Sequence, residues 1–175
     1  MLEAEIWGIA ETGDGYMIFI KPLEGEYSVP IFIGQLEAQA ILIGFGGISI
    51  SRPLTIDLLQ NVIKELNLEL LRIEICDLKD NTFFGALVLK NSQGKEIIID
   101  ARPSDAIAMA VRSQSPIFIN EKIVAKAGIS TDSLSIEKEQ ASKRSLLQKE
   151  LEDAIILEDY EQAAEIRDLL KQMEQ

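Results

Sequence analysis

The chain has 175 residues, of which 47% are hydrophobic, and its formal net charge at pH 7 is −12. Because it contains no histidine, Ser-His-Asp and Cys-His catalysis, histidine-ligated zinc and histidine general bases are excluded. The negative charge disfavours nonspecific electrostatic binding of nucleic acid, and the length allows one domain with a small appendage.

The first part of the chain predicts three strands and two helices. Residues 3–9 alternate in hydropathy, residues 16–20 follow a Gly-Asp-Gly turn, and residues 27–33 contain Pro30, which is typical of an edge strand or a bulge. A helix follows Gly34 and ends at the glycines of residues 44–47. A second helix, through about Leu66, is amphipathic, with apolar residues at helical spacing: Leu58, Leu59, Val62, Ile63 and Leu66.

The next part predicts a meander and two further helices. Residues 68–78, 82–89 and 96–100 read as strands, and the last turn, residues 91–94, is a typical hairpin loop. An alanine-rich helix begins at Pro103, and a strand over 116–119 and a helix over 121–127 follow. We therefore expect an α+β domain over residues 1–128, with packed helices on a mostly antiparallel sheet.

After this domain the composition changes. Residues 129–140 have no sustained periodicity and read as a linker, and residues 141–175 form helix-favouring stripes without glycine or proline. Asp159, with Gln162 three residues later, is typical of a helix restart. The sequence thus predicts a C-terminal helical hairpin that is marginal alone and binds a partner.

Location is predicted from three features. The lone Cys76 cannot form an internal disulfide, so we expect a buried thiol in a reducing cytoplasm. Glu3 and Glu5 stand where a signal peptide has basic residues, and no run reaches the ~18 apolar residues of a membrane span. No membrane association is expected.

Two Arg-Pro junctions concentrate polar side chains at predicted helix starts. Asp100 ends a strand, and Arg102, Pro103, Ser104 and Asp105 follow. Proline suits the first helical position, and a hydroxyl and a carboxylate in the first turn can meet its unpaired N–H groups.

The earlier segment Arg52-Pro53-Leu54-Thr55-Ile56-Asp57 repeats the pattern, so the two junctions could line one cleft. The alternative is that each arginine pins its helix start by pairing with a nearby carboxylate: Arg52 with Asp57, and Arg102 with Asp100. Glu37 could in the same way cap its own helix.

Three blocks of residues 1–128 resemble the bifunctional nuclease domain family: residues 30–38, 52–59 and 100–108. Ile56 stands where the family usually has histidine. The resemblance implies hydrolysis of phosphodiester bonds in RNA and DNA. Residues 147–168 resemble the UVR motif, which implies a protein contact through Tyr160, Ala163, Ala164 and Arg167, and we expect a homo-oligomer.

For that reaction we expect carboxylates to act on water or to hold one or two divalent ions, Mg²⁺ or Mn²⁺, with Asp100 and Asp105 as metal ligands. Arginines would clamp the phosphate, and Ser104 would donate a hydrogen bond. The carboxylates are Glu37, Asp57, Asp100 and Asp105, and the arginines are Arg52, Arg102 and Arg112.

Two other functions remain open. An acidic domain without histidine, joined to a partner-binding hairpin, is also typical of a non-enzymatic interaction or regulatory module whose Arg-Asp junctions are structural. Small-anion binding at the helix starts is the third, because arginines and helix N-termini suit phosphate or carboxylate ligands.

Overall fold

A computed structural model of the chain describes residues 1–13, 15–47 and 51–132, together with Leu147, Leu151 and Arg167. The chain divides into two compact units, Met1–Ile129 and Ser130–Gln175. The predicted hairpin over 141–175, with Tyr160, Ala163 and Ala164, lies outside the described residues; Leu147, Leu151 and Arg167 are helical, and Arg167 is exposed.

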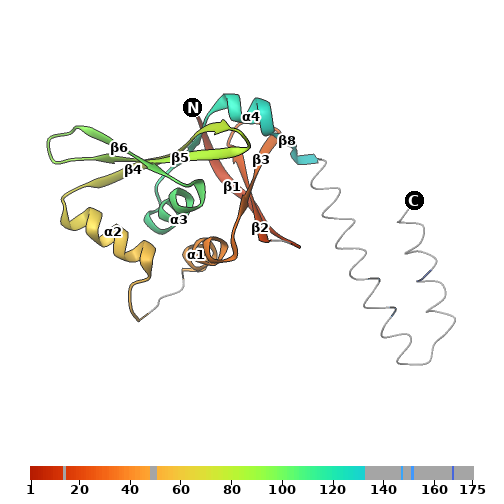
Figure 1. The fold of residues 1–175 in the computed structure, drawn as a ribbon, viewed down its shortest axis with the longest axis horizontal. Coiled ribbons are helices and arrows are strands. Elements are labelled where there is room, and N and C mark those ends of the chain that lie inside the picture. The colour runs from red at the N-terminus through yellow and green to blue at the C-terminus, as the bar shows by residue number, and fades with distance from the viewer. Residues whose placement is uncertain (14, 48–50, 133–146, 148–150, 152–166, 168–175) are drawn as a thin grey trace. The chain divides into compact units, whose positions relative to one another are not determined.

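Within the described residues, an eight-stranded sheet has the order β6-β5-β4-β7-β1-β2-β3-β8 (Figure 1). Most strand pairs are antiparallel, and β4 and β7 pair in parallel. The strands are β1 (Leu2–Thr12), β2 (Gly15–Pro22), β3 (Tyr27–Ile33), β4 (Glu69–Lys79), β5 (Thr82–Lys90), β6 (Glu96–Ala101), β7 (Ile117–Ile119) and β8 (Ile129–Ser130). The predicted α+β class is confirmed.

Helices α1 (Gln35–Phe45), α2 (Thr55–Glu65) and α3 (Pro103–Ser113) accompany this sheet, and α4 (Glu121–Ala127) follows β7. In Figure 1, α1 and α3 lie side by side beneath the strands. Helix α3 is the most deeply buried, since Ser104 and residues 106–110 are all buried. Its alanines allow this close packing because they bring the backbone near both α1 and the sheet.

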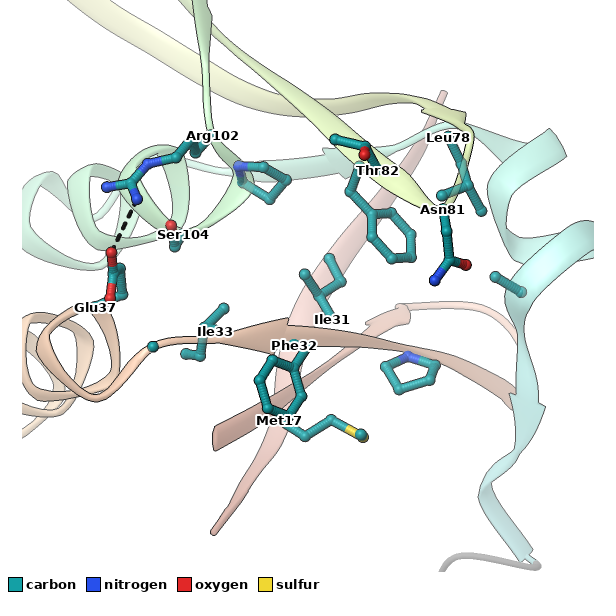
Figure 2. A pocket seen from close by; sticks show the side chains of 15 residues that line it. Met17, Ile31, Phe32, Ile33, Glu37, Leu78, Asn81, Thr82, Arg102 and Ser104 are labelled. Atoms are coloured by element: carbon teal, nitrogen blue, oxygen red, sulfur yellow. Dashed lines mark hydrogen bonds and ion pairs between the residues drawn. The ribbon is translucent and has the colours of Figure 1, made fainter. Parts of the chain in front are cut away.

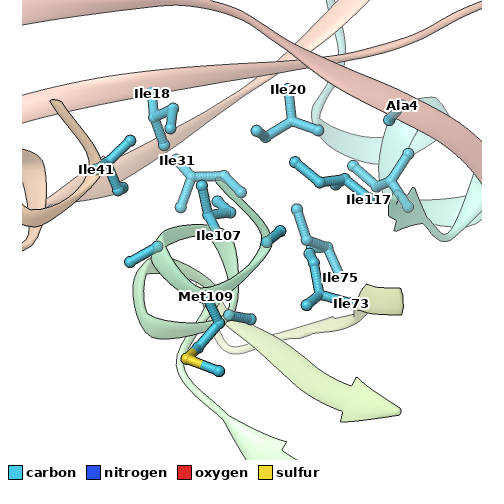
Figure 3. Packing of buried hydrophobic residues seen from close by; sticks show 14 of the residues in the cluster. Ala4, Ile18, Ile20, Ile31, Ile41, Ile73, Ile75, Ile107, Met109 and Ile117 are labelled. Atoms are coloured by element: carbon cyan, nitrogen blue, oxygen red, sulfur yellow. The ribbon is translucent and has the colours of Figure 1, made fainter. Parts of the chain in front are cut away.

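The core lies between the sheet and these helices, and period-two alternation builds it. Buried isoleucines recur at every second position: Ile18 and Ile20 in β2, Ile73 and Ile75 in β4, Ile117 and Ile119 in β7. Figure 3 shows Ile18, Ile20, Ile73, Ile75 and Ile117 gathered with Ile107 and Met109 of α3. Alternating burial therefore fixes which face of each strand meets α3.

The predicted elements agree with the structure except at the end of the domain. Residues 129–130, predicted to begin the linker, form the short strand β8 beside β3. A strand of two residues has no periodicity to detect, so the prediction was wrong there. Pro30 lies in β3, and the short strand β8 lies between β3 and that edge of the described sheet. In the described residues, no helix is both long and apolar enough to cross a membrane.

Candidate functional site

The junction between β6 and α3 is held close to β5. Arg102 is the N-cap residue with an extended backbone, and Pro103 occupies the first turn as predicted. A Cβ atom at Gly85 of β5 would lie 3.1 Å from the Ala101 carbonyl oxygen and 3.2 Å from the Pro103 nitrogen. Glycine at this position therefore leaves the space that the backbone around Arg102 occupies.

We expect Gly85→Ala to displace this backbone, because its neighbours are main-chain atoms that cannot rotate away. Overpacking of this kind costs about 1–3 kcal/mol, which corresponds to a fall in melting temperature of a few degrees. Thermal unfolding measures the change, with Gly8→Ala in β1 as the control variant, since nothing lies within 4 Å of a Cβ atom there and its φ is not positive. An undisturbed melting temperature for Gly85→Ala would contradict the close approach.

Arg102 is bound by two carboxylates from different helices. Its Nε donates to Asp105 Oδ2 at 2.8 Å, its Nη2 to Asp105 Oδ1 at 3.0 Å, and its Nη1 to Glu37 Oε1 at 2.9 Å. Asp105 and then Glu37 raise the pKa of the guanidinium above its ordinary value. A guanidinium has five N–H groups, so two remain without a partner in the described residues. The Arg102 side chain is 66% exposed, and these donors are accessible.

A cavity of about 540 Å³ opens beside this cluster (Figure 2). Its wall combines β3, the turn between β4 and β5, and the starts of α1 and α3. Ser104, only 7% exposed, lines it together with Glu37 and Arg102. The other lining residues include Met17, Ile31, Phe32, Ile33, Leu78, Asn81, Thr82 and Phe83. Arg102 thus brings a charged donor to the edge of a largely apolar hollow.

The second junction forms a different contact. Arg112, at the end of α3, donates from Nε to Asp57 Oδ1 at 2.6 Å and from Nη2 to Asp57 Oδ2 at 3.0 Å. Asp57 also accepts the Leu54 N–H at 3.0 Å. The bond from Arg112, and then that from Leu54, lower the pKa of Asp57. The two side chains are 19% and 22% exposed, so the pair joins α2 to α3 in a partly buried place.

The two junctions do not share a cavity. Asp57, Arg112 and Ile56 line a separate hollow of about 340 Å³, whose other residues are mostly apolar. The idea that both Arg-Pro starts line one cleft is therefore wrong. Helix α1 explains the separation, because its Glu37 faces the Arg102 cavity while its Leu36 and Ala40 line the other one.

The predicted pairs of arginine and nearby carboxylate do not form, and other pairs take their place. Asp57 pairs with Arg112 rather than Arg52, and Arg102 pairs with Asp105 and Glu37 rather than Asp100. Asp105 therefore bonds a guanidinium instead of the N–H groups of its helix, and the hydrogen bond that the structure gives Glu37 comes from Arg102. Arg52 is exposed and has no ion pair among the residues that the structure describes.

Asp100 does not lie with Asp105. In β6, Ile97 and Ala101 pack against the core, whereas Ile98 is 67% exposed. Because side chains alternate along a strand, Asp100 lies on the face of Ile98, away from α3. Its charge helps to raise the pKa of Cys76, where burial is the largest cause. The predicted metal pair of Asp100 and Asp105 therefore does not assemble.

The sequence-derived candidates include Glu37, Arg102 and Ser104 but omit the rest of the cavity wall, including Met17, Phe32, Asn81 and Thr82. Phe32 carried a signal, because it alternates with buried Ile31 and Ile33 and must face outward. Asn81 lies in the tight turn between β4 and β5, and Thr82 begins β5; no sequence signal assigned either to the site, because the sheet brings them to the cavity.

The chain was compared with known proteins. Residues 18–132 match the family described as the bifunctional nuclease domain. An uncharacterized protein of Mycobacterium tuberculosis is 36% identical over 113 residues, which cover 65% of this chain and 66% of that protein. Bifunctional nuclease 2 of Arabidopsis thaliana is 24% identical over 165 residues, covering 81% of this chain and 50% of the plant protein. Bifunctional nuclease 1 of Oryza sativa subsp. japonica is 23% identical over 124 residues, covering 69% and 38%.

The chain spans 66% of the length of the mycobacterial relative and half or less of these two plant proteins. The matched residues 18–132 contain all the strands from β3 to β8 and the four helices. Both Arg-carboxylate clusters also fall inside them. This chain belongs to the bifunctional nuclease domain family.

Proposed function

We propose that the chain is a nuclease that hydrolyses phosphodiester bonds of RNA or DNA in the cavity beside Arg102, with the help of a divalent cation. The observation that carries the proposal is Arg102 itself, fixed between Glu37 and Asp105 at that cavity with two N–H groups unused. A guanidinium that is oriented in advance suits the paired oxygens of a phosphate. The plant relatives named as bifunctional nucleases support the reaction class.

The charge at the cluster supports a need for a cation. One guanidinium and two carboxylates carry a net charge of −1, which opposes the approach of a phosphodiester. Mg²⁺ and Mn²⁺ prefer oxygen ligands, and Mg²⁺ is usually held by one or two carboxylates together with substrate phosphate and water. Glu37 and Asp105 offer such a pair, although no group of three or more potential ligands occurs in the described part of the chain. When bound, the ion would supply charge neutralisation and a more acidic water.

Glu37 is the proton acceptor that the contacts favour. Both oxygens of Asp105 bond to Arg102, whereas Glu37 uses Oε1 alone and its Oε2 accepts no hydrogen bond within the described residues. Oε2 can take the proton from a water that attacks phosphorus, while Arg102 stabilises the charge that develops on the phosphate oxygens. The P–O bond to the leaving oxygen breaks, and that oxygen takes a proton from solvent. Ser104, which lines the cavity at the start of α3, would donate a hydrogen bond to the phosphate.

Cleavage of labelled single-stranded RNA and DNA tests the proposal. We expect cleavage with Mg²⁺ or Mn²⁺, none with EDTA, and a loss of about 10²-fold or more in Glu37→Gln, the usual size of a general-base effect. Glu96→Gln is the matched control, because Glu96 also pairs with an arginine, Arg72, but lines no part of this cavity. Equal rates in both variants and the wild type, or cleavage that persists in EDTA, would contradict the proposal.

A non-enzymatic interaction module is the second candidate. The apolar side of α2 favours it, since Leu58, Val62 and Leu66 are 58%, 45% and 64% exposed. Mn²⁺ distinguishes the two functions, because a cation bound at Glu37 and Asp105 raises the melting temperature and a purely structural arginine network does not respond.

The C-terminal segment enters the proposal as a protein-binding element. Its helix-favouring stripes over 141–175 support a protein partner or self-association into a homo-oligomer. The lone Cys76, which cannot form an internal disulfide, supports activity in a reducing compartment such as the cytoplasm.

A further inference from the structure

We infer that Phe32 is a base-stacking residue, and that the substrate entering the Arg102 cavity is single-stranded nucleic acid. This inference rests on the proposed nuclease function and narrows its substrate class. Phe32 lines the same cavity as Arg102, and its side chain is the most exposed of the large apolar residues there.

The strand pattern turns Phe32 outward. Its neighbours Ile31 and Ile33 are 3% and 4% exposed, whereas Phe32 is 55% exposed. Figure 2 shows the ring beside Met17 and on the opposite side of β3 from Ile31, and Met17 is also its partner in the antiparallel pair. Arg102 lies on the Ile31 side, so Phe32 and Arg102 line the one cavity from the two sides of β3. Single-stranded nucleic acids bind to exposed aromatic rings on sheets together with arginines.

The ring is also held in place. Gly15, at the start of β2, has a φ of 152°, and a Cβ atom there would lie 3.2 Å from Cε1 and from Cζ of Phe32. The ring therefore rests against the glycine backbone, and no side chain at position 15 displaces it. A fixed ring loses little conformational entropy when a base stacks on it.

A cationic side chain lies near each end of the cavity. Arg102 stands at one end, and at the other the Lys126 ammonium donates to the Leu78 carbonyl at 3.3 Å. Leu78 and Ala127, the residue after Lys126, line the cavity wall. A chain of nucleotides across the cavity would have a cation at each end and Phe32 on its wall. Bases in a duplex are already stacked on both faces, so an unpaired base is the one that Phe32 can receive.

Binding of a fluorescein-labelled 12-mer tests this inference, measured by anisotropy in the Glu37→Gln background so that the oligonucleotide stays intact. We expect the additional change Phe32→Ala to weaken single-strand binding by about fivefold to 150-fold, the effect of losing one stacked base. Phe45→Ala is the matched control: Phe45 is 53% exposed on α1 and lies outside this cavity. The duplex of the same sequence should bind more weakly and should not respond to Phe32.

Phe32→Tyr should retain binding, and Phe32→Leu, which keeps the bulk without the aromatic face, serves if Phe32→Ala fails to fold. Equal single-strand affinity in the Phe32 and Phe45 variants, or duplex binding as tight as single-strand binding, would overturn the inference. The two proposals fail separately. A wild-type chain that cleaves nucleic acid with Phe32 irrelevant loses only the stacking role, whereas one that binds single strands through Phe32 and never cleaves them loses the nuclease.

Discussion

Arg102→Lys is expected to lower the rate of phosphodiester cleavage by about 10²- to 10³-fold, the usual effect of removing a preorganised donor from a developing oxyanion. Lysine keeps the positive charge but cannot bind Asp105 through two parallel N–H groups, reach Glu37 and still offer donors to a phosphate. The melting temperature should change by about 2 °C or less, because the Arg102 side chain is 66% exposed and exposed ion pairs contribute little stability.

Arg72→Lys is the control that this chain offers. Arg72 is also bound by two carboxylates, Glu74 at 2.7 Å and Glu96 at 3.3 Å, and these raise the pKa of its guanidinium. It does not line the Arg102 cavity. Cleavage should therefore be unchanged in Arg72→Lys. If both lysine variants lose activity equally, or if Arg102→Lys cleaves at the wild-type rate, Arg102 does not contact the phosphate.

The local features of this fold could be read from the sequence. Alternation predicted the strands, and Pro103 marked the first turn of α3, because both signals depend on neighbouring residues alone. The turn at 91–94 was also predicted from neighbouring residues, because glycine readily adopts the positive φ of 81° that Gly94 has there. Each of these elements is specified within a few residues of chain.

The pairings at the site could not be read in this way. Glu37 lies 65 residues from Arg102, and Asp57 lies 55 residues from Arg112. Which carboxylate meets which arginine depends on how α1 and α2 each pack against α3, and therefore on contacts such as that between Gly44 of α1 and Val111 of α3. A sequence with several acidic residues near each arginine allows many pairings, and the pairs next to one another in the chain were the wrong ones.

The position of Asp100 could be predicted from the sequence only in part. The run Ile97-Ile98-Ile99 is apolar at every position, so it hides the alternation that decides which face Asp100 occupies. Packing resolves it: Ile97 and Ala101 meet the core, and Asp100 faces the other way. When a strand is apolar on both faces, its sequence therefore predicts that a strand forms but does not predict which face the last residue occupies.

The two Arg-carboxylate clusters differ in exposure, which indicates different roles. Arg102 and Asp105 have exposed side chains, whereas Arg112 and Asp57 are each about one-fifth exposed and are joined by two parallel hydrogen bonds. An exposed cluster suits the binding of a ligand, and a partly buried pair suits the docking of α2 on α3. Matched substitutions in the two clusters separate the roles.

Asp57→Asn is expected to lower the free energy of unfolding by about 2 kcal/mol, which corresponds to about 4–8 °C in melting temperature, because it leaves the Arg112 charge partly buried without a counter-ion. Asp105→Asn, the same change in the exposed pair, should cost no more than about 1 kcal/mol. The comparison uses thermal unfolding of both variants beside the wild type at pH 7. Equal losses would remove the distinction between the two clusters.

The effect of Asp57 should also depend on pH in a stated direction. The folded chain holds the pKa of Asp57 below its ordinary value of about 3.9, chiefly through the bond from Arg112. A lowered pKa contributes stability that is complete above the unfolded value and is lost as pH falls through the folded value. The difference in melting temperature between the wild type and Asp57→Asn should therefore be constant from pH 5 to pH 8, about its full size, and should shrink steadily below about pH 4. A difference that persists undiminished at about pH 2 would mean that the shape of the amide, and not the lost charge, destabilises the variant.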